Sequence, residues 1–318
     1  MKSFTVKQFL PFAAALLLAA CTSTDEVDGT GGGGDGVIGF RQPAVSRAAV
    51  DDASQVDAFS VWGYRIPSGG GEASVLFDGA KVYRSGNGWT YDDAPKYWAA
   101  GYVHRFVGLY PDGQQANTKV ASDGTLTLSG FTATGDIDLM TAAVTYEYTD
   151  ASETPPAVQM PFGHELSRVQ LVVKTDQGVT ATITRAVLYG MSNTGTLTRP
   201  LSETASSSWN LGTATTSGDT PFKNETPVTL QPASTAILWD GLLLIPQSTS
   251  GLKLDITLQR SGEQPSTETV TLDNPARWTA AQSYRYVLTI EADAITFGGF
   301  TVPDWGETNT GGNINIGK

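Results

Sequence analysis

Residues that could carry catalysis or bind a metal are few in this chain and widely spaced. The two histidines, His104 and His164, lie about 60 residues apart, and neither has neighbours at the spacing of a metal site or a catalytic triad. Acids lie close together at Asp92–Asp93 and at Asp136 and Asp138, but such groups in turns and at strand edges are usually solvated. No nucleophile elbow, zinc-protease motif, phosphate-binding loop or dinucleotide fingerprint occurs. We therefore expect a protein that is not an enzyme, with no catalytic residue, no metal site and no cofactor.

The one cysteine, Cys21, is placed where a lipid anchor would be attached. It follows a basic start at Lys2 and Lys7 and an apolar run, Phe9–Ala20, that is too short to cross a bilayer as a stable helix. This order is similar to that of bacterial lipoprotein signals, which implies that residues 1–20 are removed and that Cys21 receives acyl chains such as palmitate. More than one such chain is enough for stable anchoring. The alternative is a plain signal peptide followed by an incidental cysteine.

Composition excludes some partners and indicates an all-β chain. The 318 residues include 20 Lys plus Arg and 32 Asp plus Glu, and the formal charge of -12 argues against a nucleic-acid partner. Abundant Thr, Ser and Gly with sparse Lys and Glu favour strands joined by tight turns. Residues 21–36 are dominated by glycine and acids with almost nothing apolar to bury, so we expect a flexible tether there.

Strand-like segments follow one another from Val37 onward. Each is short, rich in β-branched and aromatic residues, and bounded by turn residues, which is typical of a β-sandwich. The polar, proline-bearing stretch Asp150–Pro156 predicts a linker, so we expect sandwich domains at 37–156 and 157–318. The nearly continuous apolar run Ile237–Ile245 predicts a strand covered on both faces. The predicted strands are Phe59–Ile66, Val75–Tyr83, Trp89–Tyr91, Val103–Tyr110, Thr125–Leu128, Ile137–Tyr148, Val169–Val173, Ile237–Ile245, Leu252–Leu258 and Tyr284–Ile290.

The first strand-like stretch, Val37–Gln42, lies at the edge of everything that is predicted to fold. Ile38 and Phe40 share one face of this strand, and glycine and arginine occupy the other. Arg47 follows, between the strand and the rest of the folded chain, where a protease could separate the two. We therefore interpret residues 37–47 as a removable first strand, a feature of assembly rather than of catalysis.

Seven tryptophans raise a second hypothesis, a surface lipoprotein that binds glycans and does not polymerise. Sugar rings stack on exposed aromatic faces. Most of the tryptophans occur in apolar strand contexts, where filling a core is the simpler role. Trp89, beside a glycine turn, and Trp209, after three serines, are the candidates for exposure.

Several stretches together resemble one known family. They occur in a fixed order over nearly the whole chain after the tether, and their combination is more specific than any one of them. The stretches are Val61–Tyr64, Trp89–Tyr91, Tyr97–Trp98, Phe106–Pro111, Pro161–Val169, Leu242–Gln247, Trp278–Ala280, Tyr284–Tyr286 and Val302–Gly306. This pattern is similar to that of the Mfa-like fimbrillins of Bacteroidales. The acids just after Cys21 loosely resemble the signal that sends lipoproteins of this group to the outer face of the outer membrane.

The resemblance implies two transthyretin-like β-sandwich domains in a lipoprotein precursor of a type V pilus on the cell surface. It further implies that an arginine-specific protease cuts after the first strand, at the position matched by Arg47 and Ala48, although Arg41 offers a second basic site. His164, Arg168 and Trp305 look like residues that hold the second domain.

Excision of the first strand would vacate the pockets of Ile38 and Phe40, and a neighbouring subunit's strand could fill them by β-strand addition. The donor would be either the segment with Ile295 and Phe297 or the segment with Ile314 and Ile316, which also suits an ordinary final strand. The implied partners are other fimbrial subunits, the outer membrane through Cys21, and a host or bacterial surface ligand.

Overall fold

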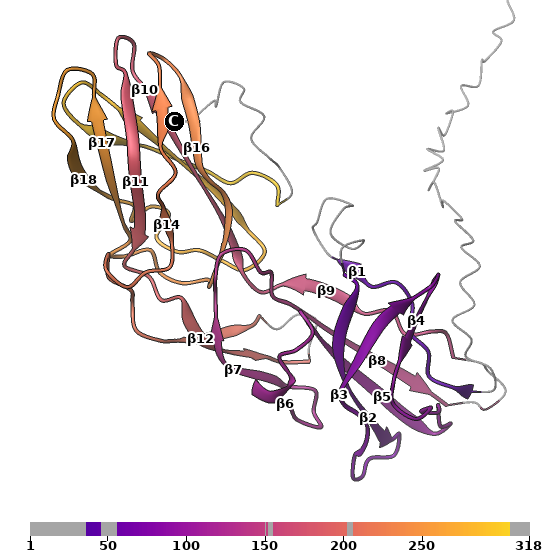
Figure 1. Cartoon of the computed structure of the whole chain (residues 1–318). Coiled ribbons are helices and arrows are strands. Elements are labelled where there is room, and N and C mark those ends of the chain that lie inside the picture. Colours follow the sequence, from indigo (N-terminus) through magenta and orange to yellow (C-terminus); the bar gives the residue numbers. More distant parts are fainter. Residues whose placement is uncertain (1–35, 46–55, 150, 152–154, 202–205, 306–318) are drawn as a thin grey trace, which may run out of the picture.

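The structure, a computed structural model, describes residues 36–45, 56–149, 151, 155–201 and 206–305. Over these ranges the chain is built almost wholly from β-strands, with a short 3-10 helix, η2 (Gln115–Asn117). The predicted all-β class is therefore confirmed. In the same ranges we find no helix with the length and apolar character needed to span a membrane. Figure 1 shows two lobes, which we call the N-terminal and the C-terminal lobe, with a smaller sheet between them.

The N-terminal lobe is organised on one sheet of seven strands. All neighbours in it pair antiparallel except the first two, which are parallel. Its strands, in spatial order, are β1 (Ala44–Val45), β9 (Pro161–His164), β8 (Met140–Tyr148), β5 (Tyr102–Tyr110), β2 (Ala58–Pro67), β3 (Ser74–Ser85) and β4 (Gly88–Tyr91).

The C-terminal lobe is a sandwich of two sheets. Its core lies between them and includes Leu171, Ile256, Trp278 and Tyr286, which are all 1% exposed or less. One sheet has the order β16 (Thr235–Leu244), β10 (Ser167–Thr175), β19 (Ser283–Ile290) and β20 (Ile295–Thr301). The other has the order β14 (Lys223–Asn224), β11 (Ala181–Tyr189), β17 (Lys253–Arg260) and β18 (Ser266–Thr271), and β15 (Val228–Leu230) also pairs with β11.

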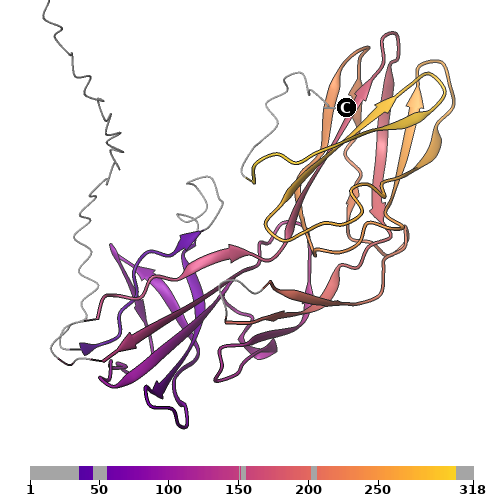
Figure 2. The same cartoon turned by 180° about the vertical axis from the view of Figure 1, so that it is seen from behind.

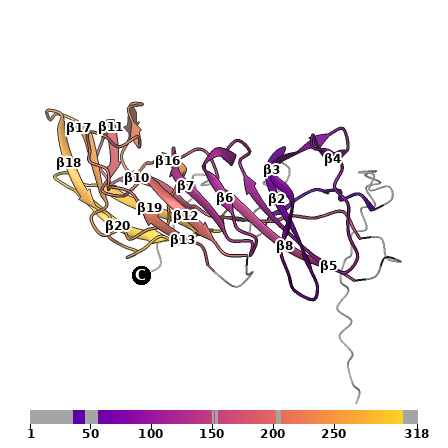
Figure 3. The ribbon, with the colours of Figure 1, turned by 90° about the horizontal axis from the view of Figure 1, so that it is seen from below.

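A third, four-stranded sheet lies between the lobes, as Figure 3 shows. Its order is β13 (Ser208–Leu211), β12 (Thr194–Arg199), β7 (Leu126–Thr132) and β6 (Thr118–Val120). Leu128 of β7 and Leu197 of β12 are paired and fully buried. They share one cluster, the middle core, with Trp62 and Leu109 of the N-terminal sheet and with Ile245. The middle sheet and its core therefore join the two halves of the sequence.

Two strand pairings cross the predicted division between 37–156 and 157–318. The middle sheet pairs β7 with β12, and β9 pairs with β8 as an added strand of the N-terminal sheet. Seen from behind in Figure 2, β9 points along the N-terminal sheet toward the C-terminal lobe. The chain thus completes the first lobe only after the stretch that we predicted to be a linker.

The run Ile237–Ile245 forms a strand, but its predicted burial on both faces is wrong. Most residues of β16 are only half-buried, because the strand lies at the edge of its sheet. Two register shifts against β10 distribute its apolar side chains, so Leu242 packs on the C-terminal core and Leu243 on the middle core. The strand covered on both faces is β19, which is buried at every position.

Candidate functional site

Residues 36–45 form an extended segment, hereafter the N-terminal segment, that is held by main-chain hydrogen bonds on two sides. On one side Ile38 N–H donates to Lys96 O over 2.8 Å, and Trp98 N–H donates to Gly36 O over 2.8 Å. On the other side the segment runs parallel to residues 158–162, with Arg41 N–H donating to Val158 O over 3.0 Å. The pairing continues into β1, where Ala44 lies opposite Pro161 of β9. The segment therefore fills a place between two stretches that are distant in the sequence.

Side chains of the N-terminal segment close the core of the lobe. Ile38 is 0% and Phe40 1% exposed. Arg41, the next residue along the strand, is exposed, as the alternation predicts. The Phe40 ring stands edge-on to Phe59 and Phe77, with ring centroids 5.9 and 5.7 Å apart. It meets two further rings, Tyr91 and Phe106, at 6.0 and 6.2 Å in the same geometry. Burial of each such side chain is worth roughly 1.5–3 kcal/mol.

Polar contacts on the outer side of the segment are exposed. Arg41 donates to the side chain of Gln159, and Arg84 donates to the side chain of Gln42. Surface contacts of this kind contribute little to stability. The segment is therefore held chiefly by two apolar side chains and by its main-chain ladder, and its removal would open an apolar groove with unpaired backbone groups on both sides.

The predicted processing and anchoring residues are placed as follows. Arg41 is in the ladder, with its own N–H bonded to Val158 O, and a backbone held in this way is a poor protease substrate until it opens. Arg47, Ala48, Cys21, Ile314 and Ile316 lie outside the described residues.

The first predicted donor segment is β20, in the C-terminal lobe. Ile295 and Phe297 are half-buried against the C-terminal core, and the Phe297 ring lies 5.8 Å from that of Tyr286. β20 pairs with β19 on one side and ends the sheet on the other. The structure therefore brings Ile38 and Phe40 together in one core, and it places Ile295 and Phe297 in a different one.

The two histidines have packing roles. His104 is fully buried, its Nε2 accepts the Ala99 N–H over 3.3 Å, and its ring lies 4.8 Å from that of Trp98. Burial lowers the pKa of His104 to about 4, so the ring is neutral. No group of three potential metal ligands occurs among the residues that the structure describes.

His164 joins the lobes rather than holding the second one alone. It belongs to β9, and its Nδ1 lies 2.5 Å from Asp138 Oδ2. The Trp305 ring, from the end of the described chain, stacks on it with centroids 4.2 Å apart. Arg168, at the start of β10, lies in the second lobe and bonds to the main-chain oxygen of Asp240.

The two tryptophans that were candidates for exposure differ from each other. Trp89 is only 8% exposed and packs on Phe59 with ring centroids 5.6 Å apart, so it is a core residue. The glycine turn before it belongs to a hairpin that folds its side chain inward. Trp209 is half-buried and lines a cavity.

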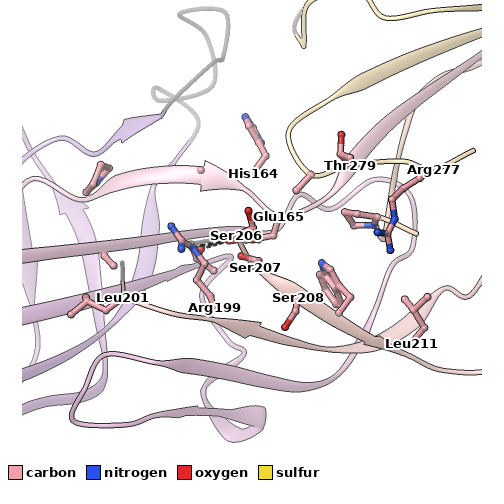
Figure 4. Close-up of a pocket in the computed structure, with 17 residues that line it drawn as sticks. His164, Glu165, Arg199, Leu201, Ser206, Ser207, Ser208, Leu211, Arg277 and Thr279 are labelled. Carbon is pink, nitrogen blue, oxygen red and sulfur yellow. Dashed lines mark hydrogen bonds and ion pairs between the residues drawn. The ribbon is translucent and has the colours of Figure 1, made fainter. Parts of the chain in front are cut away.

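This cavity, of about 910 Å³, was not predicted from the sequence. It lies where β8 and β9 face β12, β13 and the segment before β19, and Figure 4 shows Glu165 between Arg199 on one side and Arg277 on the other. Glu165 is 4% exposed, and its burial raises the pKa of the carboxyl group. Because these residues are far apart in the sequence, no local spacing could have indicated the site.

Comparisons with known proteins agree with one another. The family model described as fimbrillin-like matches residues 46–305. A fimbrial protein from Bacteroides vulgatus has a similar fold, with a TM-score of 0.56, 17% identity, and 85% of this chain and 100% of that chain covered. A protein from Bacteroides ovatus, provisionally described as a cell adhesion protein, has a TM-score of 0.52 and 14% identity, with 85% and 96% covered. At these identities the two likenesses show the fold alone. No curated protein matches the chain significantly.

Proposed function

The chain belongs to the fimbrillin-like family and is a surface fimbrial or adhesion subunit, and we propose that it polymerises by β-strand exchange after its N-terminal segment is cut off. In this proposal the precursor is anchored in the outer membrane through acylated Cys21 and cleaved between Arg47 and Ala48. It forms homopolymers, or heteropolymers with other fimbrial subunits.

The observation that carries the proposal is the way in which residues 36–45 complete the N-terminal lobe. Their main-chain groups pair with residues 96–98 on one side and 158–162 on the other. Ile38 and Phe40 fill the core from the same segment. An extended strand from another subunit, with apolar residues two apart, offers the same pairing and the same side chains, which is β-strand addition.

Repetition of this contact gives a fibre. The groove lies on the N-terminal lobe and the donor comes from the C-terminal part of the next subunit, so the two surfaces differ and the contact does not close on itself. β20 would have to leave β19 and withdraw Phe297 from the C-terminal core before it could act as donor. This cost favours the segment with Ile314 and Ile316 as the donor.

Arg47 is the better cleavage site for this purpose. A cut after Arg41 would leave Ala44 and Val45 paired with β9, whereas a cut after Arg47 releases the whole described segment. The main-chain hydrogen bond of Arg41 also protects it.

Treatment of the purified precursor with an arginine-specific protease tests the proposal. We expect a product that starts at Ala48 and forms ladders on electrophoresis, read out by N-terminal sequencing and by electron microscopy of fibres. Arg47→Ala should block both, and Arg41→Ala, the matched control, should block neither. Absence of polymer from correctly cleaved protein under every condition would refute strand exchange.

A further inference from the structure

We propose that the cavity between the lobes binds a saccharide that carries a carboxylate, such as a uronate or sialate unit. The cavity is lined by residues of the N-terminal sheet, of the middle sheet and of the segment before β19. Its volume of about 910 Å³ lies in the upper part of the usual range for small-ligand sites, roughly 300–1,000 Å³. Both apolar and hydrogen-bonding groups face it, as in most such sites.

Two arginines supply the positive charge. Arg277 is exposed on one wall, and among the described residues its side chain has no hydrogen-bond or ion-pair partner. Arg199 lies on another wall, with its Nε 3.5 Å from Glu165 Oε1. Figure 4 shows that the two side chains approach the cavity from different elements. The planar fork of a guanidinium suits a carboxylate, with which it forms two parallel hydrogen bonds.

Glu165 is the reason to choose a sugar over a phosphate. Its carboxyl group is buried at the cavity, accepts a hydrogen bond from the Thr141 hydroxyl and lies next to Arg199. A phosphate would bring about two negative charges close to this group, whereas a uronate or sialate brings one, and like charges in a poorly solvated place repel strongly. A sugar brings hydroxyl groups, which can donate to a carboxylate as well as accept from a protonated carboxyl.

The remaining walls match a polyhydroxylated ligand. Ser206, Ser207 and Ser208 lie beside Glu165, and Thr279 lines another wall, where its hydroxyl also bonds to that of Tyr284. Each hydroxyl can both donate and accept a hydrogen bond. Trp209 and Leu211 add apolar surface to the same wall, and aromatic side chains pack well on the C–H faces of sugar rings.

The binding site is separate from strand exchange. None of its lining residues belongs to the N-terminal segment, so the uncleaved, full-length chain presents it. A failure to bind sugars would leave polymerisation untouched, and a failure to polymerise would leave this binding untouched.

Isothermal titration calorimetry of the full chain in detergent, with trigalacturonate as the probe, tests the proposal. We expect binding of trigalacturonate and none of its fully methyl-esterified form, which has the same size but no charge. A second pair, sialyllactose and lactose, distinguishes a sialate from a uronate ligand. Triglutamate presents carboxylates without a sugar, and binding as tight as that of trigalacturonate would overturn the assignment.

Arg277→Gln should weaken trigalacturonate binding about 10-fold or more, because a charge-assisted hydrogen bond is lost. Since Arg277 is exposed, this variant should keep the melting temperature of the wild type. Arg185→Gln is the matched control, because the side chain of Arg185 on β11 is 38% exposed and forms its ion pair with Glu225, away from the cavity. Binding of neither acidic sugar, or equal binding by Arg277→Gln and wild type, would refute the proposal.

Discussion

Phe40 stands edge-on to four other aromatic rings, although it comes from a segment that ends only five residues later in the described chain. Side chains at this depth usually belong to central strands. Here one is supplied by an extended segment that lies between residues 96–98 and residues 158–162 and is joined to both by main-chain hydrogen bonds. Substitution of a deeply buried side chain such as Phe40 should therefore have a large effect on the stability of the precursor.

Phe40→Ala should lower the free energy of unfolding of the precursor by about 3–5 kcal/mol, because it removes a buried ring and leaves a cavity among the others. Arg41→Ala is the control, since Arg41 is exposed and loses one surface contact, and it should change stability by less than about 0.5 kcal/mol. Urea unfolding followed by tryptophan fluorescence measures both. Equal effects of the two variants would mean that the segment is not part of the cooperative core.

His104 should make stability depend on pH. Its folded-state pKa is lowered to about 4 from 6.5, so the folded state holds the ring neutral where the unfolded state takes up a proton. The part of the free energy of unfolding that depends on a neutral His104 is fully present above pH 6.5. It is lost as the pH falls from 6.5 toward 4, by no more than about 1.4 kcal/mol per pH unit.

In His104→Gln the side-chain carbonyl can still accept the Ala99 N–H, but the group no longer titrates. Urea midpoints at several pH values between 7.5 and 4 should therefore fall less steeply than in the wild type. Parallel curves for the two proteins would contradict this role.

At the scale of the elements, the N-terminal segment and β9 support each other. β1 pairs with β9, and β9 in turn pairs with β8 at Met140 and Thr141. Loss of the segment removes the outer partner of β9 and uncovers the face of the sheet that carries Phe59, so a replacement strand gains both main-chain and side-chain contacts.

A synthetic peptide with the sequence of residues 36–45 should therefore compete with the donor strand. Added to freshly cleaved protein, it should shorten or abolish the ladders, because it fills the groove from which it was taken. The control peptide has Ser in place of Ile38 and Phe40, and it should not compete. If both peptides acted alike, side-chain pockets would have no part in the exchange.

The molecule as a whole is joined through its middle sheet. Leu128 comes from the first half of the sequence and Leu197 from the second, and both are fully buried in the middle core. Trp305 of the last described turn adds a second link by stacking on His164 of β9. The lobes should therefore unfold together.

Leu197→Ala should destabilise the protein by about 2–5 kcal/mol and increase hydrogen exchange in both β5 and β10. Leu211→Ala is the matched control, because Leu211 lies on the neighbouring strand β13 and is 40% exposed. Calorimetry should show one transition for each protein. Two transitions, or protection lost in only one lobe, would show that the lobes are independent.

Local patterns were sufficient to predict about half of the described strands and the inward direction of Ile38 and Phe40. A strand repeats every two residues, so alternation between apolar and polar residues reveals which side chains share a face before any partner is known. The absence of catalytic spacings disfavoured an enzyme, and the place of the first strand before Arg47 favoured a protein of assembly, as did the family resemblance.

The pairing of distant segments was decided only by the tertiary structure. Arg285 on β19 is buried, and its Nε donates to Gln170 Oε1 over 2.8 Å on the adjacent strand β10. The exposure of Trp89, the place of β9 in the first lobe and the cavity around Glu165 depend likewise on which strands meet. The periodicity of a segment indicates which of its side chains share a face, but the residues that cover each face come from elsewhere in the chain.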